Sequence, residues 1–452
     1  MVLPPPPPRP RPALSTPRLL ARVREAFESI PDHRQAAKCD ITLADALMSG
    51  LAVFALKFPS LLKFDEQRHE DHIRHNLETL YGVKQAPCDT QLREITDPVE
   101  PTTVHPAFRS LLQVAQETGV LEQYRFLDRC ILVSIDGTGL FASSAISCPE
   151  CAIKQSRGGE TSYYHQLVGA VIIHPDGKQV LPLIPEPILR HDGETKNDCE
   201  QNAVKRLLIR LRRDYPKLPI IVVEDALFAK GPHLKLLKEL NISYIIGVKE
   251  GDHAHLFEAV KAHEDHDTMG GLVQHDTQKN ITRVFRFVNG LELNKSHPDI
   301  KVNFLEYVEL EAGRVRYRFT WITDREINEH NCIDIMRGGR ARWKVENETF
   351  NTLKNQGYRL EHNYGHGQQH LSTNFALLMM LAFLVDQLQE LAYEPFQQAR
   401  QRFRSRTSLW DRMRALFVGY FIDSWDIFWE AIIRGHQVAR LQPKTMAPNN
   451  TS

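Results

Sequence analysis

Three acidic side chains that are far apart in the sequence are candidates for shared chemistry. Asp136 follows the apolar run ILVSI and opens the turn-like stretch Asp-Gly-Thr-Gly, and Asp225 follows the apolar run IIVVE. Each aspartate is therefore expected at the carboxyl end of a buried strand, where functional groups gather in open α/β sheets. Taken singly, an aspartate in such a place is more often a turn residue or a helix cap.

The third acidic residue, Glu346, lies in a segment expected to be one helix, residues 331–354, broken or bent near residues 338–339. At helical spacing it shares one apolar stripe with Trp343, Phe350 and Leu353. A carboxylate inside a core-facing stripe is costly unless it is paired, protonated or bound to a metal. Arg342 lies four residues earlier and within reach, so a buried salt bridge is the structural alternative.

Together the three carboxylates suit the chemistry of divalent metal ions. Mg²⁺ prefers hard oxygen ligands and keeps several waters when a few carboxylates bind it. Two such ions about 3.5–4 Å apart activate an attacking water or 3′-hydroxyl and stabilise the leaving oxygen of an in-line displacement at phosphorus. Asp136, Asp225 and Glu346 are therefore candidate metal ligands and catalytic residues, with two Mg²⁺ (or Mn²⁺) ions as cofactors.

The elements that must position these residues come in a definite order. Three strand-forming runs are expected to form a meander, with a hairpin turn at Asp176 and Gly177. Helices and strands then alternate, with helices expected at 196–214 and 232–240 and strands at 220–224 and 243–249. This order predicts an α/β fold, a ribonuclease-H-like mixed sheet flanked by helices. A β-rich insertion at about 275–323 precedes the helix of Glu346.

The regions on either side of this α/β part read as helical. The expected organisation is a disordered Pro-rich lead at 1–18, a helical N-terminal domain at 19–125, the α/β domain at 126–390, a helical C-terminal region at 391–440 and a disordered tail at 441–452. The apolar helices near the C-terminus are interrupted by charges, and we find no uninterrupted apolar run of about 18 residues. No membrane span is therefore expected.

Charge, cysteine pattern and the motifs missing from the sequence argue against several other classes of protein. The 452 residues carry 56 basic and 56 acidic side chains, so any DNA contact must come from local basic clusters rather than from the net charge. The seven cysteines show no disulfide framework. Neither a GxxxxGK[ST] loop nor a GxGxxG loop after a strand is present, which argues against ATP or NAD chemistry, and no Gly-x-Ser-x-Gly elbow indicates a serine hydrolase.

Three fragments carry a resemblance to a known family. IDGTG, VVEDALFAKGPHLKLLKEL and RWKVENETFNTLKNQGYRLEHNYGHG resemble the three catalytic blocks of the DDE transposases of bacterial insertion sequences. More narrowly, they are similar to insertion-sequence family four and its relatives, in which a β-rich insertion lies between the second aspartate and the glutamate. The resemblance covers roughly residues 130–385, and the third block is its most specific part.

The resemblance implies an enzyme that cuts element ends and joins them to target DNA. Its partners would be double-stranded DNA and, when DNA is bound, a second copy of the chain, in the bacterial cytoplasm near the nucleoid; the N-terminal helical domain would help to recognise the ends. The expected DNA contacts are Arg337, Arg340, Arg342, Lys344 and Lys354. Family members often carry a tyrosine and a lysine where this chain has Gly339 and Leu353, whereas Arg342 keeps its place. Trp343 is expected to pack rather than to stack on a base.

Cysteines and histidines form two further groups. Cys148 and Cys151 make a CxxC pair that, with His165 or Cys199, would suit a structural Zn²⁺ ion, although the second close pair typical of such sites is missing. Two ordinary reduced cysteines are the alternative, and the one that the sequence favours. Three more histidines are spaced by four residues, at His362, His366 and His370. The glycines between them indicate a loop, in which hydrogen bonding or DNA contact is expected rather than metal binding.

Two other functions remain open beside the transposase. A relative that keeps the fold but has lost catalysis would bind DNA without any dependence on divalent metal. A two-metal nuclease would cut DNA without joining a 3′-hydroxyl end to a target.

Overall fold

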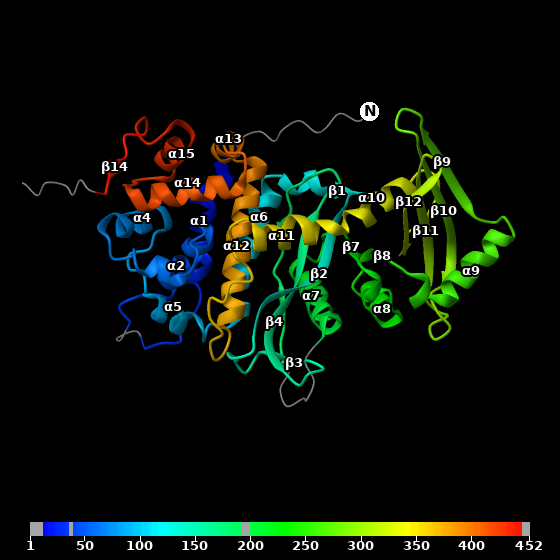
Figure 1. Cartoon of the computed structure of the whole chain (residues 1–452), viewed down its shortest axis with the longest axis horizontal. Helices are drawn as coiled ribbons and strands as arrows, with labels where there is room; N and C mark the ends of the chain where they lie inside the picture. The colour runs from blue at the N-terminus through cyan, green and yellow to red at the C-terminus, as the bar shows by residue number, and fades with distance from the viewer. Residues whose placement is uncertain (1–11, 36–38, 191–198, 445–452) are drawn as a thin grey trace, which may run out of the picture.

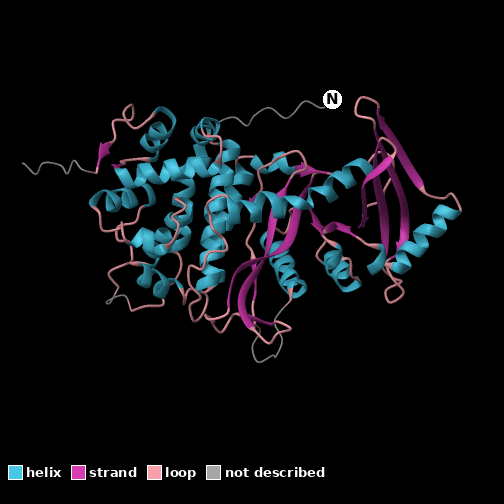
Figure 2. Ribbon diagram, viewed as in Figure 1, coloured by secondary structure: helices cyan, strands magenta, loops and turns pink. Residues whose placement is uncertain are grey.

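The computed structural model describes residues 12–35, 39–190 and 199–444. The molecule is elongated, with a helical body at one end, a mixed sheet in the middle and a group of long antiparallel strands at the other end (Figure 1). Figure 2 shows helices filling the helical body, whereas strands and helices lie together in the middle and at the other end. The residues expected to carry chemistry belong to the middle part and to the helix that crosses it.

The strand that contains Asp136 is β2 (Cys130–Ser143), whose apolar first half is buried. It pairs antiparallel with β4 (Thr161–Ile173) and parallel with β7 (Ile220–Glu224), and β7 pairs parallel with β8 (Ser243–Gly247). All five residues of β7 are buried, as is typical of a strand covered on both faces. The flanking elements are β1 (Arg125–Phe126), β3 (Ala152–Gln155), β5 (Leu181–Pro182), β6 (Glu186–Ile188), α7 (Glu200–Asp214) and α8 (Gly231–Glu239). This layout is consistent with the expected ribonuclease-H-like sheet.

The β-rich insertion continues the central sheet instead of forming a separate body. The strands of the insertion and the helix before them are α9 (Ala254–Asp265), β9 (Gly270–Asp276), β10 (Ile281–Glu292), β11 (Lys301–Glu311) and β12 (Arg314–Thr323). They form an antiparallel meander, and its last strand joins β8 through the pairs Trp321–Gly247, Ile322–Ile246 and Thr323–Ile245. The sheet therefore runs without interruption from β4 to β9.

One long helical segment crosses the sheet from the insertion toward the helical body (Figure 1). It consists of α10 (Cys332–Arg340), a 3-10 turn (Ala341–Trp343), a π-helical stretch (Val345–Phe350) and α11 (Asn351–Asn355). The predicted interruption near residues 338–339 is found slightly later, because regular α-helix continues to Arg340 and the irregular turns begin at Ala341. Both glycines are instead contact points, since a Cβ atom on Gly339 would lie 2.5 Å from the indole Nε1 of Trp321.

We expect Gly339→Ala to lower the stability of the protein. The added methyl group must displace the Trp321 ring, and such overpacking costs roughly 1–3 kcal/mol, more than the gain of about 1 kcal/mol in helix propensity from glycine to alanine. The midpoint of thermal unfolding should fall by several degrees. The matched control is Gly419→Ala, at the end of another helix with nothing within 4 Å, which should be neutral or slightly stabilising. Equal midpoints for Gly339→Ala and wild type would contradict this packing.

The helical body is built around α12 (Leu371–Ala392), whose side chains are nearly all buried. Its length and apolar character would suit a membrane span, but protein covers the whole of it, so it is a core helix. The other elements of this body are α1 (Thr16–Glu28), α2 (Leu43–Ala55), α3 (Leu61–Asp65), α4 (Asp71–Tyr81), α5 (Asp89–Thr96), α6 (His105–Glu117), α13 (Glu394–Arg402), α14 (Arg406–Gly419), α15 (Trp425–Arg434), β13 (Tyr420–Phe421) and β14 (Gln442–Pro443). N-terminal and C-terminal helices thus share one core, as α12 packs against α2 and α14 against α4.

Both chain ends differ in part from the expected disorder. A 3-10 turn at Pro12–Leu14 and helix α1 from Thr16 lie within the lead predicted to be disordered, and Leu14 is fully buried. Gln442–Pro443 pairs with β13, within the predicted disordered tail. The rest of both predictions, residues 1–11 and 445–452, lies outside the described residues.

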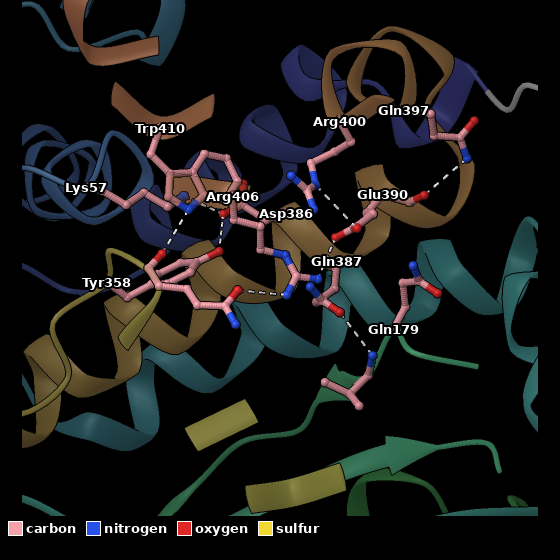
Figure 3. Close-up of polar contacts among 12 residues, drawn as sticks. Lys57, Gln179, Tyr358, Asp386, Gln387, Glu390, Gln397, Arg400, Arg406 and Trp410 are labelled. Atoms are coloured by element: carbon pink, nitrogen blue, oxygen red, sulfur yellow. Dashed lines mark hydrogen bonds and ion pairs between the residues drawn. The ribbon is translucent and has the colours of Figure 1, made fainter. Parts of the chain in front are cut away.

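A buried polar network joins the N-terminal helices to α12 and the C-terminal helices (Figure 3). Lys57, just after α2, ion-pairs with Asp386 of α12, and its ammonium lies 4.4 and 4.0 Å from the ring centres of Tyr358 and Trp410. The Tyr358 hydroxyl donates a hydrogen bond to the same carboxylate. Burial lowers the pKa of Lys57 and raises that of Asp386, so each charge depends on the other.

Candidate active site

The two aspartates lie side by side at one end of the parallel strand pair. The β2–β7 pairing ends at Ser134 and Val223, and Asp136 and Asp225 each follow two residues later. Adjacent strands are about 4.8 Å apart, so the two backbones leave the shared edge as neighbours. The prediction that Asp136 ends its strand is wrong, because β2 continues to Ser143 and Asp136 pairs with Gly169 of β4. What ends just before Asp136 is the pairing of β2 with β7, whose last paired residues are Ser134 and Val223.

Glu346 meets Asp136 through the side chain of Arg342. The guanidinium donates one hydrogen bond to Asp136 Oδ2 and one to Glu346 Oε1, both 3.0 Å long. The helical segment is fixed over the strand because the Ser134 hydroxyl donates to the Arg342 carbonyl at 2.9 Å. The salt bridge considered from the sequence is therefore present, and it includes Asp136 as well as Glu346.

The electrostatics of this group favour an added cation. Burial and then a hydrogen bond with Glu346 raise the pKa of Asp136, the positive charge of Arg342 opposes both effects, and the net result is a pKa of about 7. Two carboxyl groups this close disfavour each other's charged form unless a cation lies beside them. Arg342, whose side chain is only 14% exposed, supplies one positive charge to the pair.

Asp225 lies on the neighbouring side of the same site. Its carboxylate caps a short 3-10 turn (Ala226–Phe228) by accepting a hydrogen bond from the Leu227 amide at 2.9 Å. Within the described chain it makes no hydrogen bond or ion pair to Asp136 or Glu346. The structure thus joins two of the three predicted carboxylates through Arg342 and places the third at the end of the adjacent strand.

A fourth carboxylate, Glu200, approaches the site and was missed by sequence reasoning. It begins α7 and lies against Gly137, where a Cβ atom would be 2.8 Å from the Glu200 carboxyl group, so a larger residue there would displace that carboxylate. Burial and then the nearby charge of Asp225 raise the pKa of Glu200. An acidic residue in the first turn of a helix is common, so the sequence offers no signal of this proximity.

A pocket of about 530 Å³ opens beside the carboxylates, between the central sheet and the insertion. Asp225 and Arg342 lie on one side of it, and β12 contributes the other. Its basic and aromatic lining includes Lys249, Arg318, Phe319, Trp321, Arg340 and Trp343, and the acidic Glu224 and Glu250 also line it. Guanidinium groups beside aromatic faces are the combination that nucleic-acid-binding surfaces use.

The five basic residues predicted to contact DNA have different surroundings. Arg337 pairs with Asp334 and Asp176, Lys354 pairs with Glu361, and Lys344 donates to the Gly177 carbonyl. Arg342 is held by Asp136 and Glu346. Arg340 lies over the rings of Tyr317 and Phe319 and faces the pocket, and the described chain offers it no carboxylate partner.

The predicted stripe around Glu346 is only partly correct. Phe350 and Leu353 are buried, but 49% of Trp343 is exposed and the Glu346 side chain is 35% exposed. The π-helical stretch changes the angular spacing, so that residues before and after it no longer share one face. The expectation that Trp343 packs is therefore wrong; its ring lies under the Arg342 guanidinium at 4.8 Å.

The cysteines and histidines separate into two sets. Cys148, Cys151, His165 and His366 gather in one place, whereas Cys199 is exposed and lies outside that group. His362 packs on Tyr364, and His370 contacts Glu150 at 2.8 Å. The loop predicted around His362, His366 and His370 is confirmed, but the three histidines have different contacts.

Comparison with known families assigns the chain to one of them. The family model described as the transposase DDE domain matches residues 132–384, which is more than half of the chain and includes all three carboxylates. The chain belongs to this family. Its members are enzymes that act on DNA, so DNA is the substrate class of this protein. No curated protein matches the chain.

Proposed function

We propose that this protein is a transposase that cuts the ends of an insertion sequence and joins the freed 3′ ends to target DNA. Asp136, Asp225 and Glu346 are the proposed catalytic residues, and the narrower affiliation is insertion-sequence family four or a close relative. The observation that carries the proposal is the pair Asp136–Glu346, bridged by one arginine at the strand end that Asp225 shares.

The donor set fits divalent metal ions. Crowded, partly buried carboxylates with a raised pKa at Asp136 are stabilised by added positive charge, and hard oxygen ligands suit Mg²⁺ or Mn²⁺. When bound, two such ions would lower the barrier to attack at phosphorus by neutralising charge on the attacking and leaving oxygens. The protein's own part is to hold the carboxylates on a rigid sheet and helix and to position the DNA. Arg342 competes with any cation for Asp136 and Glu346.

The pocket beside the carboxylates is the proposed place where DNA lies closest to them. Arg340 faces it with no acidic partner among the described residues, so it is the best placed of the five basic residues for a phosphate contact. Arg337, Arg342, Lys344 and Lys354 would have to exchange their present partners for phosphates. Recognition of the element ends by the N-terminal helices, and a homodimer that holds two ends, complete the proposal.

The deciding experiment is a strand-transfer assay with DNA that carries the element end. Cleavage followed by joining of the 3′-hydroxyl end to a target, in Mg²⁺ or Mn²⁺ but not in EDTA, would support the proposal. Metal-dependent cleavage without joining would identify the two-metal nuclease instead. Binding to the element end without any metal-dependent cleavage would identify the catalytically silent relative.

We expect Arg342→Ala to make the stability of the protein depend more strongly on Mg²⁺. Without the guanidinium, Asp136 and Glu346 lose their shared partner, which should lower the stability by roughly 1–3 kcal/mol in EDTA. A bound divalent ion would again neutralise the charges of Asp136 and Glu346. Mg²⁺ should therefore raise the melting temperature of the variant more than that of wild type. Arg337→Ala, which removes an arginine paired elsewhere, should respond to Mg²⁺ as wild type does. Equal Mg²⁺ shifts in all three proteins would contradict the prediction.

A further inference from the structure

Four side chains from separate parts of the sequence converge outside the carboxylate site. Cys148 and Cys151 belong to the loop after β2, His165 to β4 and His366 to the loop before α12. Each offers one thiol sulfur or ring nitrogen, and these four atoms all lie within 4.8 Å of one another. Among the described residues, this is the one group of three or more cysteine, histidine and acidic side chains whose ligand atoms lie close enough together to hold a metal ion.

The separations match a tetrahedral metal site. The two sulfurs are 3.5 Å apart, each lies 3.2 Å from Nε2 of His165, and the Cys151 sulfur lies 3.3 Å from Nδ1 of His366. A tetrahedral zinc ion with Zn–S bonds of about 2.3 Å and Zn–N bonds of about 2.0–2.1 Å places neighbouring ligand atoms roughly 3.3–3.8 Å apart. Four of the six separations among these atoms therefore already lie within a few tenths of an ångström of that arrangement, and the other two are no longer than 4.8 Å.

The local backbone is built to present these ligands. The turn between the cysteines is closed by two hydrogen bonds, from the Cys151 amide to the Cys148 carbonyl at 3.1 Å and from the Cys148 amide to the Cys151 sulfur at 3.4 Å. His366 stands between Gly365 and Gly367, whose φ angles of +139° and +71° are ones that side-chain-bearing residues rarely adopt.

The four side chains are largely shielded from solvent, and a second contact joins the same two loops. Cys151, His165 and His366 are only 2%, 3% and 6% exposed, and the ring of Phe141 packs on His366 with the ring centres 4.6 Å apart. Beside the cluster, the His370 ring contacts Glu150, the residue next to Cys151, at 2.8 Å. The same two loops are thus joined both through the four proposed ligands and through a hydrogen bond between two residues outside that set.

We propose that Cys148, Cys151, His165 and His366 bind one structural Zn²⁺ ion. Two thiolates and two imidazoles form a ligand set that suits zinc and that does not suit Mg²⁺. Four protein ligands leave no open coordination position, so the ion has no catalytic part. This site is separate from the carboxylates and does not rest on the proposed transposase activity.

The position of the ion gives it a definite structural task. His366 belongs to the loop that follows the helix of Glu346, and His165 belongs to β4, which pairs with the strand of Asp136. Zinc would therefore fasten the segment after one carboxylate to the sheet that carries the other. It would also fix the cysteine loop against the helical body.

Elemental analysis of the full-length chain, purified without added metal or chelator, tests the proposal. We expect about one zinc ion per chain in the wild type and almost none in Cys151→Ser or His366→Ala. The matched control is Cys199→Ser, which removes an exposed thiol outside the cluster and should keep the full zinc content. His366→Cys exchanges one zinc ligand for another and should restore binding.

A second measurement keeps the test decisive if the variants fail to fold. Co²⁺ exchanged into the wild-type chain should give the visible absorption of a tetrahedral ion, with a thiolate-to-cobalt charge-transfer band. A wild-type chain that holds no zinc and gives no such spectrum overturns the proposal. A thiol titration showing that Cys148 and Cys151 are joined as a disulfide overturns it as well, as does full zinc content in a folded Cys151→Ser variant.

Discussion

Asp136→Asn is expected to lower the rate of DNA cleavage by at least about a thousandfold, which corresponds to roughly 4 kcal/mol in the activation barrier. The substitution keeps the size of the side chain and one oxygen that still accepts from Arg342, but it removes the charge that would hold a divalent ion. Folding and binding of the element end should be almost unchanged. The measurement is single-turnover cleavage of labelled end DNA at saturating protein, with binding followed separately by fluorescence anisotropy.

The same loss is expected for Asp225→Asn and Glu346→Gln. The matched control is Glu348→Gln, which makes the same chemical change two residues away in the same π-helical stretch, outside the arginine bridge. It should retain cleavage within a few fold of wild type. Substantial cleavage by Asp136→Asn, or an equal loss in the Glu348→Gln control, would remove the assignment of these carboxylates.

Lys57→Met is expected to destabilise the protein by about 3–5 kcal/mol, the largest effect on stability that we predict. The Lys57 side chain is 1% exposed and the Asp386 side chain 9%, so the substitution leaves a buried carboxylate without its countercharge. The cation–π contacts with Tyr358 and Trp410 are lost at the same time. Urea-induced unfolding, followed by tryptophan fluorescence, measures the change.

Two further variants test whether the loss of stability comes from the buried ion pair or would follow the loss of any lysine charge. Lys63→Met removes an ion pair with Glu66 in which the lysine is 52% exposed, and it should change stability by less than about 0.5 kcal/mol. Lys57→Met combined with Asp386→Leu removes both charges and should recover much of the loss. If Lys57→Met alone costs less than about 1 kcal/mol, the pair does not stabilise the core as proposed.

Much of the sheet was predictable because continuous apolar runs indicate buried strands. The runs that begin at Ile131 and Ile220 predicted β2 and β7, and the insertion was expected within a few residues of where β9 begins. The error at Asp136 has a physical cause. Gly137 and Gly139 suggested a turn, but the Glu200 carboxyl group packs against Gly137, and β4 continues to pair with β2 beyond it.

The geometry of the helix over the sheet was beyond local reasoning. No glycine or proline lies between Val345 and Phe350, yet this stretch is π-helical, because Arg342 and Ser134 fix the turn before it by tertiary contacts. The proposed zinc site also depends on contacts that the local sequence does not reveal. The CxxC pair was visible in the sequence, and its partner His165 was named, but His366 lies 215 residues after Cys151 and only folding brings the two together.

The pairing of β12 with β8 carries a consequence for how this protein can vary. A chain that lost the insertion would uncover the hydrogen-bonding edge of β8, next to the buried residues Ile245 and Ile246. Such a bare, apolar edge is a template for strand addition by another molecule, so the shortened chain would tend to aggregate. The insertion thus covers the edge of β8 by pairing with it. If the insertion were lost, charged or proline residues along β8 would be needed to protect that edge.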